Sequence, residues 1–202
     1  MISLDTLLNL LIAILIGYLL GTIPVAALVS RYRGVDIFTT GTGLAGAGNV
    51  FHNVGHKEGL VVFVGDFAKG GLAIIIAYRL GLVDHMALPA AVAVVLGHWH
   101  SPFTGFRGGD GLSSLSAVSL VLLPAITLLS VAFATIVFIV ARRTDYHPTL
   151  WSSAAGYGFL FWRASTSDAS LGVALGVATL SLLVIGHAVL GHRRQDASSL
   201  PE

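Results

Sequence analysis

Residues 6–29 read TLLNLLIAILIGYLLGTIPVAALV, a run that contains no charged side chain. As a helix, this run would extend about 36 Å at 1.5 Å per residue. The hydrocarbon core of a bilayer is about 30 Å thick, so the run is long enough to cross it. We therefore predict a transmembrane helix at the start of the chain.

The rest of the chain is also strongly apolar. Of its 202 residues, 55% are hydrophobic and 10% are charged, and the mean hydropathy is +0.85. Soluble domains carry about 25% charged residues, so a soluble fold could not bury this much apolar surface. Further apolar runs lie at about 60–83, 86–103, 112–141, 149–162 and 169–190. We predict an all-α polytopic integral membrane protein, a single domain over 1–202 that ends in a short polar, disordered tail at 192–202.

The number of spans depends on the run 112–141, which has Pro124 near its middle. Proline removes an amide donor and clashes with the preceding turn, which favours two short helices there. Two helices give about seven spans, and they leave only Arg79 and Arg163 on the outer side. The basic residues on the other side are then Arg31, Arg33, Lys57, Arg107, Arg142, Arg143, Arg193 and Arg194.

A single helix over 112–141 would instead divide the same ten basic residues equally between the two sides. Cytoplasmic loops collect Lys and Arg, which favours the unequal division and therefore about seven helices, some of them short. In this topology the N-terminus lies outside, and the C-terminus and the glycine-rich loops lie in the cytoplasm.

Two loops on the predicted cytoplasmic side are rich in glycine: 36–50 reads DIFTTGTGLAGAGNV and 97–111 reads GHWHSPFTGFRGGDG. The first contains G-x-G-x-x-G, but a dinucleotide-binding fingerprint needs a preceding strand in a βαβ unit, whereas a membrane span precedes this loop. Glycines let consecutive backbone amides face an anion. We predict that the two loops form a site for a polar, anionic ligand; a flexible connector is the alternative.

Asp66 and Lys69 are three residues apart inside an apolar run, so their side chains lie on one face of a helix. Ionisable residues inside a span are costly and usually face a bundle interior or a cavity. A functional role and a mutually neutralised structural pair both remain open.

Four motifs follow one another along the chain: GTIP (21–24), DIFTTGTGLAGAGNV (36–50), DFAKG (66–70) and GHWHSPFTGFRGGDG (97–111). In order and spacing, over about residues 15–145, they resemble the bacterial acyl-phosphate:glycerol-3-phosphate acyltransferases. The resemblance implies a seven-span enzyme of the inner membrane that acts in phospholipid biosynthesis. Such an enzyme transfers a fatty acyl group from acyl phosphate to the 1-hydroxyl of glycerol 3-phosphate and produces lysophosphatidic acid and phosphate. It uses no metal or nucleotide cofactor, contacts membrane lipids and binds no nucleic acid.

Matched position by position, the resemblance also implies the site residues. The catalytic ones are Thr22, Lys69, His98 and His187. Those that bind phosphate and substrate are Gly41, Thr42, Gly43, Gly46, Asn49, Arg107, Gly108, Gly109 and Gly111.

The chain also departs from the family motifs. The replacements, with the family's residue in parentheses, are Phe38 (arginine), Leu44 (asparagine), Gly48 (threonine), Asp110 (lysine) and Leu190 (asparagine). Two of them remove cations and Asp110 adds an anion, which weakens the binding of a phosphate dianion. Arg107, three residues before Asp110, could restore some positive potential.

Three functions are therefore compatible with the sequence. The chain could be an active acyltransferase with a rebuilt phosphate site. It could instead be a family member that has lost catalysis and binds a lipid or a partner, or an unrelated small transporter. A transporter predicts corresponding broken helices in two halves of the chain, and the sequence has no such repeat. His98 and His100 form H-x-H with no third ligand nearby, so we predict no metal site.

Overall fold

The computed structural model describes residues 3–143, 148–167 and 171–198, with side chains described as far as Gly191. This part of the chain is all-helical, which confirms the predicted class. The α-helices are α1 (Leu4–Thr22), α2 (Val25–Tyr32), α3 (Ala47–Asn53), α4 (His56–Arg79), α5 (Leu88–Trp99), α6 (Leu112–Leu122), α7 (Pro124–Ala141), α8 (Pro148–Ser165) and α9 (Leu171–Ser198). The short 3₁₀ helices are η1 (Ile37–Thr39), η2 (Asp84–Ala87) and η3 (Pro102–Thr104).

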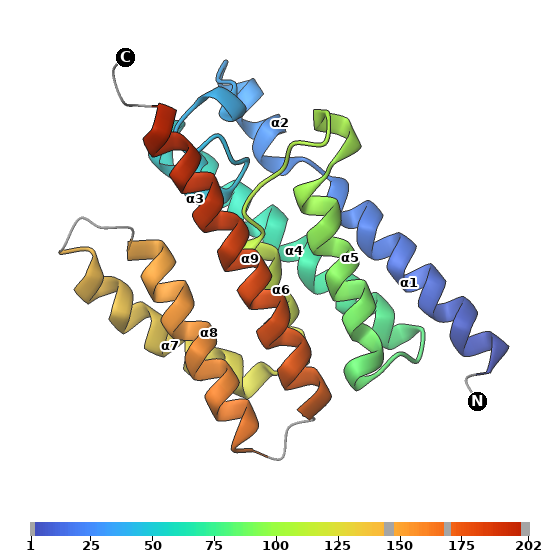
Figure 1. Cartoon of the computed structure of the whole chain (residues 1–202). Helices are drawn as coiled ribbons and strands as arrows, with labels where there is room; N and C mark the ends of the chain where they lie inside the picture. Colours follow the sequence, from blue (N-terminus) through green and yellow to red (C-terminus); the bar gives the residue numbers. More distant parts are fainter. Residues whose placement is uncertain (1–2, 144–147, 168–170, 199–202) are drawn as a thin grey trace.

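The long helices form one layered bundle (Figure 1). α1 packs along α5, α4 along α6, and α7 along α8, while α9 contacts both α8 and α6. The chain direction alternates from α4 through α9, and α1 begins at the end of the molecule opposite to the end of α9. Both glycine-rich loops, together with α2 and α3, lie at the end where α9 finishes.

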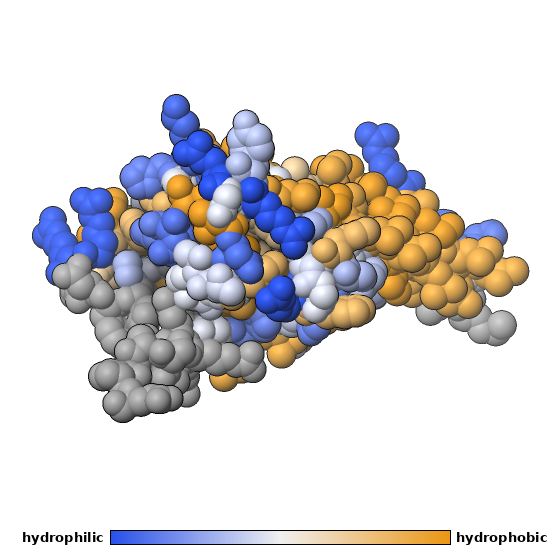
Figure 2. All heavy atoms as spheres, turned by 90° about the horizontal axis from the view of Figure 1, so that it is seen from above, coloured by the Kyte–Doolittle hydropathy of each residue, from blue (hydrophilic) through white to orange (hydrophobic). Residues whose placement is uncertain are grey.

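Four helical stretches are long and apolar enough to cross a membrane: Leu4–Tyr32, His56–Arg79, Pro124–Ala141 and Leu171–Gly191. α6 is apolar but shorter. Figure 2 shows hydrophilic side chains gathered over the loop-bearing end, beside a hydrophobic surface on the side of α1. The chain is therefore an integral membrane protein, and the exact number of spans stays a prediction.

The first predicted span is wrong in one detail, because 6–29 is not one helix. α1 ends at Thr22 and α2 begins at Val25. Pro24 lacks the amide hydrogen that would continue the ladder. The break leaves the carbonyl groups of Gly21 and Ile23 free to accept from another part of the chain.

The predicted break at Pro124 is confirmed. α6 ends at Leu122 and α7 begins at Pro124, with Leu123 in a non-helical conformation between them. Proline is well suited to the first position of a helix, where its missing amide costs nothing. Thr127 Oγ1 donates to the carbonyl of Ser119 at 2.8 Å, so the hydroxyl links the two helices across the break.

Small residues bring α1 and α5 close together. A Cβ on Gly21 would collide with the carbonyl of Val94, and one on Gly97 with the carbonyl of Tyr18. Interfaces between membrane helices commonly use glycine in this way, because it lets the backbones approach. This packing fixes the end of α1 next to the end of α5, where the second glycine-rich loop begins.

The last helix includes part of the predicted polar tail. α9 continues to Ser198, so residues 192–198 of that tail are helical, and its residues 199–202 lie outside the described residues. A helix that has already formed propagates at little cost, so the last span extends through these polar residues.

Candidate active site

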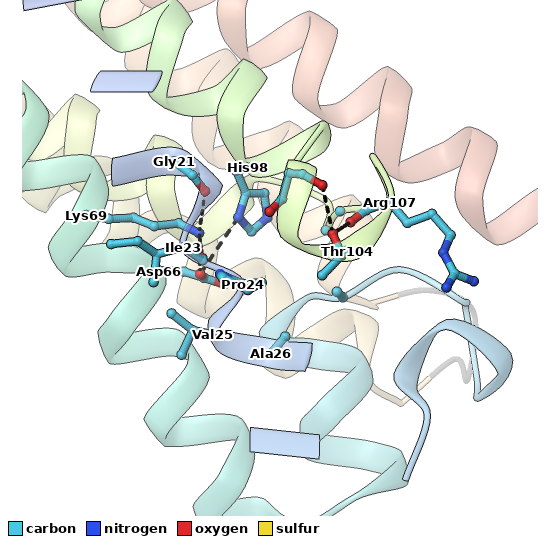
Figure 3. A pocket seen from close by; sticks show the side chains of 14 residues that line it. Gly21, Ile23, Pro24, Val25, Ala26, Asp66, Lys69, His98, Thr104 and Arg107 are labelled. Atoms are coloured by element: carbon cyan, nitrogen blue, oxygen red, sulfur yellow. Dashed lines mark hydrogen bonds and ion pairs between the residues drawn. The ribbon is translucent and has the colours of Figure 1, made fainter. Parts of the chain in front are cut away.

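A small pocket lies where the break after α1, the middle of α4, the end of α5 and the second glycine-rich loop meet. Figure 3 shows its side chains converging from these elements. The polar residues that line it are Asp66, Lys69, His98, Ser101, Thr104 and Arg107. Ala45 adds the first glycine-rich loop to the wall, and Gly108 and Gly109 add backbone from the second.

Lys69 is held by three partners at the base of this pocket (Figure 3). Its Nζ lies 2.8 Å from Asp66 Oδ1 and donates to the carbonyls of Gly21 at 3.2 Å and Ile23 at 3.1 Å. The carbonyls exposed by the break at Pro24 thus receive the ammonium group. Both charged side chains are buried, with 4% and 2% of their surface exposed. A single buried charge would be very unfavourable, so the pair is needed for the fold and also brings a cation to the pocket.

His98 adds a third polar group to the same corner. Its Nδ1 lies 3.7 Å from Asp66 Oδ1. Its Nε2 is buried and has no hydrogen-bond partner in the described part of the chain. A Cβ on Gly109 would collide with this nitrogen, so the glycine keeps the space beside it open. We call Asp66, Lys69 and His98 the buried cluster.

The second loop is tied to the break after α1 by hydroxyl groups that the sequence did not indicate. Ser101 Oγ donates to the carbonyl of Thr22 at 2.6 Å. Thr104 Oγ1 lies at hydrogen-bond distance from the carbonyls of Ser101 and Arg107. These bonds hold the turn that forms the pocket wall and pair the carbonyl groups of Ser101 and Arg107.

The first glycine-rich loop is held from inside by Asn49. Its Nδ2 donates to the carbonyls of Thr40 and Leu44, each at 2.9 Å, and to that of Ile37 at 3.4 Å. The side-chain oxygen of Asn49 accepts from Asn53 Nδ2 at 2.8 Å. The side chain of Asn49 therefore shapes the loop, because its donors are already engaged in this structure.

Gly41 and Gly43 of the same loop have φ values of +55° and +67°. This left-handed region favours glycine. A Cβ on Gly41 would also collide with the side chains of Asn49 and Asn53. These glycines are thus required by the backbone conformation that Asn49 holds in place.

The two glycine-rich loops contact each other directly. The amide of Ala45 donates to the carbonyl of Gly108 at 3.0 Å. Asp110 faces Gly46, where an added Cβ would lie 2.7 Å from Asp110 Oδ2. Its Oδ1 accepts from the amide of Leu112 at 3.0 Å and so caps the start of α6. The predicted meeting of the two loops is borne out by these contacts.

Arg107 does not point toward the buried cluster (Figure 3). Its Cζ lies 4.5 Å from the ring centroid of Phe38, a cation–π contact at an exposed position. Phe38, Arg107 and Asp110 together form what we call the loop cluster. Its cation is at the rim, and its carboxylate lies where the loops meet.

His187 stacks on Trp99, with ring centroids 4.6 Å apart and an interplanar angle of 22°. Trp99 Nε1 donates to the carbonyl of Asp110 at 3.0 Å. Gly111, with a φ of +89°, leaves room for this indole nitrogen. Trp99 therefore connects α9 to the second loop.

The structure brings five of the predicted site residues together in the pocket: Lys69, His98, Arg107, Gly108 and Gly109. The others surround it without forming its wall: Thr22, Gly41, Thr42, Gly43, Gly46, Asn49, Gly111 and His187. Thr22 Oγ1 donates to the carbonyl of Leu19 at 2.7 Å, and Thr42 Oγ1 accepts from the amide of Leu44 at 3.3 Å. Whether these residues touch a substrate stays a prediction.

Comparison with known proteins identifies the family of the chain. The sequence profile described as glycerol-3-phosphate acyltransferase matches residues 11–196. This chain belongs to the glycerol-3-phosphate acyltransferase family. Relatives include glycerol-3-phosphate acyltransferase 1 of Deinococcus radiodurans, 42% identical over 61% of this chain and 63% of that one. The glycerol-3-phosphate acyltransferase of Geobacter sulfurreducens is 32% identical over 89% and 91%.

Solved structures agree with this assignment. The glycerol 3-phosphate form of PlsY, an integral membrane glycerol 3-phosphate acyltransferase, has a TM-score of 0.75 to this chain, at 26% identity over 93% of this chain and 90% of that one. Its lysophosphatidic acid form has a TM-score of 0.74, also at 26% identity. Family membership supports the acyltransferase interpretation over the transporter.

Proposed function

We propose that this protein transfers a fatty acyl group from acyl phosphate to the 1-hydroxyl of glycerol 3-phosphate, and that the pocket around the buried cluster is where transfer occurs. The supporting observation is that Lys69, His98 and both glycine-rich loops meet in one pocket of a chain from this family. The reaction forms an ester bond, breaks the bond between the acyl carbon and the phosphate oxygen, and releases inorganic phosphate.

Each group in the pocket fits a step of this reaction. Lys69 brings buried positive charge to the pocket, and its ammonium can stabilise negative charge on the leaving phosphate once one of its three partners gives way. The unpaired Nε2 of His98 can hold the attacking hydroxyl in position. Holding both substrates in one pocket supplies much of the rate, since the reaction no longer waits for their encounter.

We further propose that the site faces the cytoplasm of a bacterial inner membrane. Arg31, Arg33, Arg107, Arg142 and Arg143 lie at the loop-bearing end, and cytoplasmic loops collect such residues. The chain has no cysteine, so a single cysteine at position 33 should resist a membrane-impermeant maleimide in whole cells. A single cysteine at position 84, at the other end, should react.

The activity is tested by incubating the purified protein with palmitoyl phosphate and glycerol 3-phosphate and measuring lysophosphatidic acid by mass spectrometry. His98→Ala should abolish the product. His100→Ala is the matched control, because this exposed histidine lies two residues away and outside the pocket. The proposal is overturned if the wild-type protein, folded by size-exclusion chromatography, forms no lysophosphatidic acid. That result would favour a family member that binds lipid without catalysis.

A further inference from the structure

A second cavity is lined by residues of α6, α7 and α8 and shares no lining residue with the active-site pocket. Its volume is about 110 Å³, which is room for a short segment of one chain and less than a whole drug-sized ligand needs. Six of its ten lining residues carry hydroxyl groups: Ser116, Thr127, Ser130, Ser152, Ser153 and Tyr157. Such a concentration of hydroxyls is unusual inside an apolar bundle and calls for a physical reason.

The cavity lies deep in the apolar part of the bundle. Tyr157 is the tenth of the 18 residues of α8, so at 1.5 Å per residue it is about 14 Å from the start of that helix. The remaining wall is apolar, and one wall residue, Val131, is 52% exposed on the outer face of α7. At Val131 the wall of the cavity therefore reaches the apolar surface of the bundle.

Four of the six hydroxyl groups are arranged as hydrogen-bond acceptors. Those of Ser116, Thr127, Ser130 and Ser152 already donate to backbone carbonyls, at 2.7–3.0 Å. A hydroxyl has one proton and two lone pairs, so each of these four can only accept from a ligand. Tyr157 Oη lies 3.5 Å from Ser116 Oγ. Because the proton of Ser116 is already committed, that contact uses the proton of Tyr157.

The absence of charge among the described lining residues limits which ligands the cavity can accept. Among the described residues, none that lines the cavity is ionisable at neutral pH. A buried ammonium would have no counter-charge there and would be strongly disfavoured. The complementary group is therefore a neutral donor, and a hydroxyl is the common neutral donor on a hydrocarbon chain.

We propose that this cavity is a lipid-binding site that selects a single hydrocarbon chain carrying a neutral hydroxyl group partway along its length. The cavity lies at the depth of the hydrocarbon core. A hydroxyl partway along a lipid chain lies at the same depth, whereas a headgroup hydroxyl does not. Binding then gives that hydroxyl the acceptors that lipid tails lack. The site is independent of the acyl transfer proposed above, because it depends on different residues.

The test uses two neutral probes of equal chain length: methyl 12-hydroxyoctadecanoate and its 12-methoxy ether, which accepts hydrogen bonds but cannot donate. Each is titrated into the purified protein in detergent, and the dissociation constant is taken from the rise in melting temperature. The hydroxy ester should stabilise the protein at concentrations where the ether does not. Equal effects of the two probes would overturn the proposal.

Variants then place the binding in the cavity. Ser116→Ala with Ser130→Ala removes two acceptors and should weaken binding of the hydroxy ester roughly tenfold. The matched control is Ser165→Ala, because Ser165 also donates to the carbonyl four residues earlier, at 2.7 Å, but lies outside the cavity. Its affinity should equal that of the wild-type protein. A double variant that binds as tightly as the control would also overturn the site.

Discussion

The buried cluster inside the pocket and the loop cluster at its rim differ in how closely they follow the motifs of the family. The buried cluster of Asp66, Lys69 and His98 matches the family's motifs and is enclosed by helices and carbonyl groups. The loop cluster contains two departures from those motifs, Phe38 and Asp110, and its cation, Arg107, lies at an exposed rim. A substitution in the buried cluster leaves a charge unpaired and so destabilises the fold. A substitution in the loop cluster changes the charge near the pocket and leaves the helix packing intact.

The largest effect is expected at the buried cluster. Lys69→Met leaves Asp66 buried without its partner and should lower the free energy of unfolding by about 3–5 kcal/mol. It should also abolish acyl transfer. Combining it with Asp66→Leu should recover much of the stability, since an apolar pair can replace a buried ion pair. Thermal unfolding and phosphate release measure the two effects, and activity in the double variant would contradict a catalytic role for Lys69.

The next largest effect is expected inside the first glycine-rich loop. Asn49→Leu removes a donor from three carbonyl groups and should cost about 2–3 kcal/mol of stability. Asn9→Leu is the matched control, because Asn9 Nδ2 donates only to Leu80 at 2.9 Å, and it should cost about 1 kcal/mol. Equal losses would show that Asn49 does not hold the loop.

A smaller effect is expected at the loop cluster, where substitution should improve substrate binding instead of reducing stability or activity. Asp110→Lys should lower the KM for glycerol 3-phosphate about tenfold, because an anion near the phosphate becomes a cation. Asp110→Asn retains an oxygen that can cap the amide of Leu112 and should lower the KM only a few-fold. Steady-state kinetics at varied glycerol 3-phosphate would reveal the order. An unchanged KM in both variants would place the phosphate elsewhere.

The smallest effect is expected where Trp99 connects the loop to α9. Trp99→Phe loses the hydrogen bond to Asp110 but keeps a ring against His187, and it should reduce kcat about threefold. Trp99→Leu loses both contacts and should reduce kcat further. If both variants retain full kcat, the stacked ring does not position His187 for the reaction.

Much of the fold was predictable, because the length of each apolar run and the place of Pro124 are direct consequences of bilayer thickness and proline chemistry. The break after α1 was missed, although Pro24 was visible, because a proline near the end of a span can also be tolerated within it. The break is stabilised by Lys69, which donates to the carbonyls of Gly21 and Ile23 from 48 and 46 residues away in sequence. Such long-range partners have no local signal.

The site was predictable in part for the same reason. The order and spacing of the four motifs identified Lys69, His98 and the glycine-rich loops, because these features can be recognised without knowledge of the fold. The roles of Ser101 and Asn49 depend on which carbonyl groups face them, and that geometry exists only after folding. The second cavity was likewise hidden, because its hydroxyls come from three separate helices.

The central claim is that a working acyl-transfer pocket persists behind a rebuilt phosphate end. It is tested most directly by measuring the release of inorganic phosphate from palmitoyl phosphate by the wild-type protein, with and without glycerol 3-phosphate. The account predicts release that depends on the acceptor, and faster release at low acceptor concentration when Asp110→Lys and Phe38→Arg are combined. Release only in that double variant, with none from the folded wild-type protein, would contradict the account and show a scaffold whose natural form no longer catalyses the reaction.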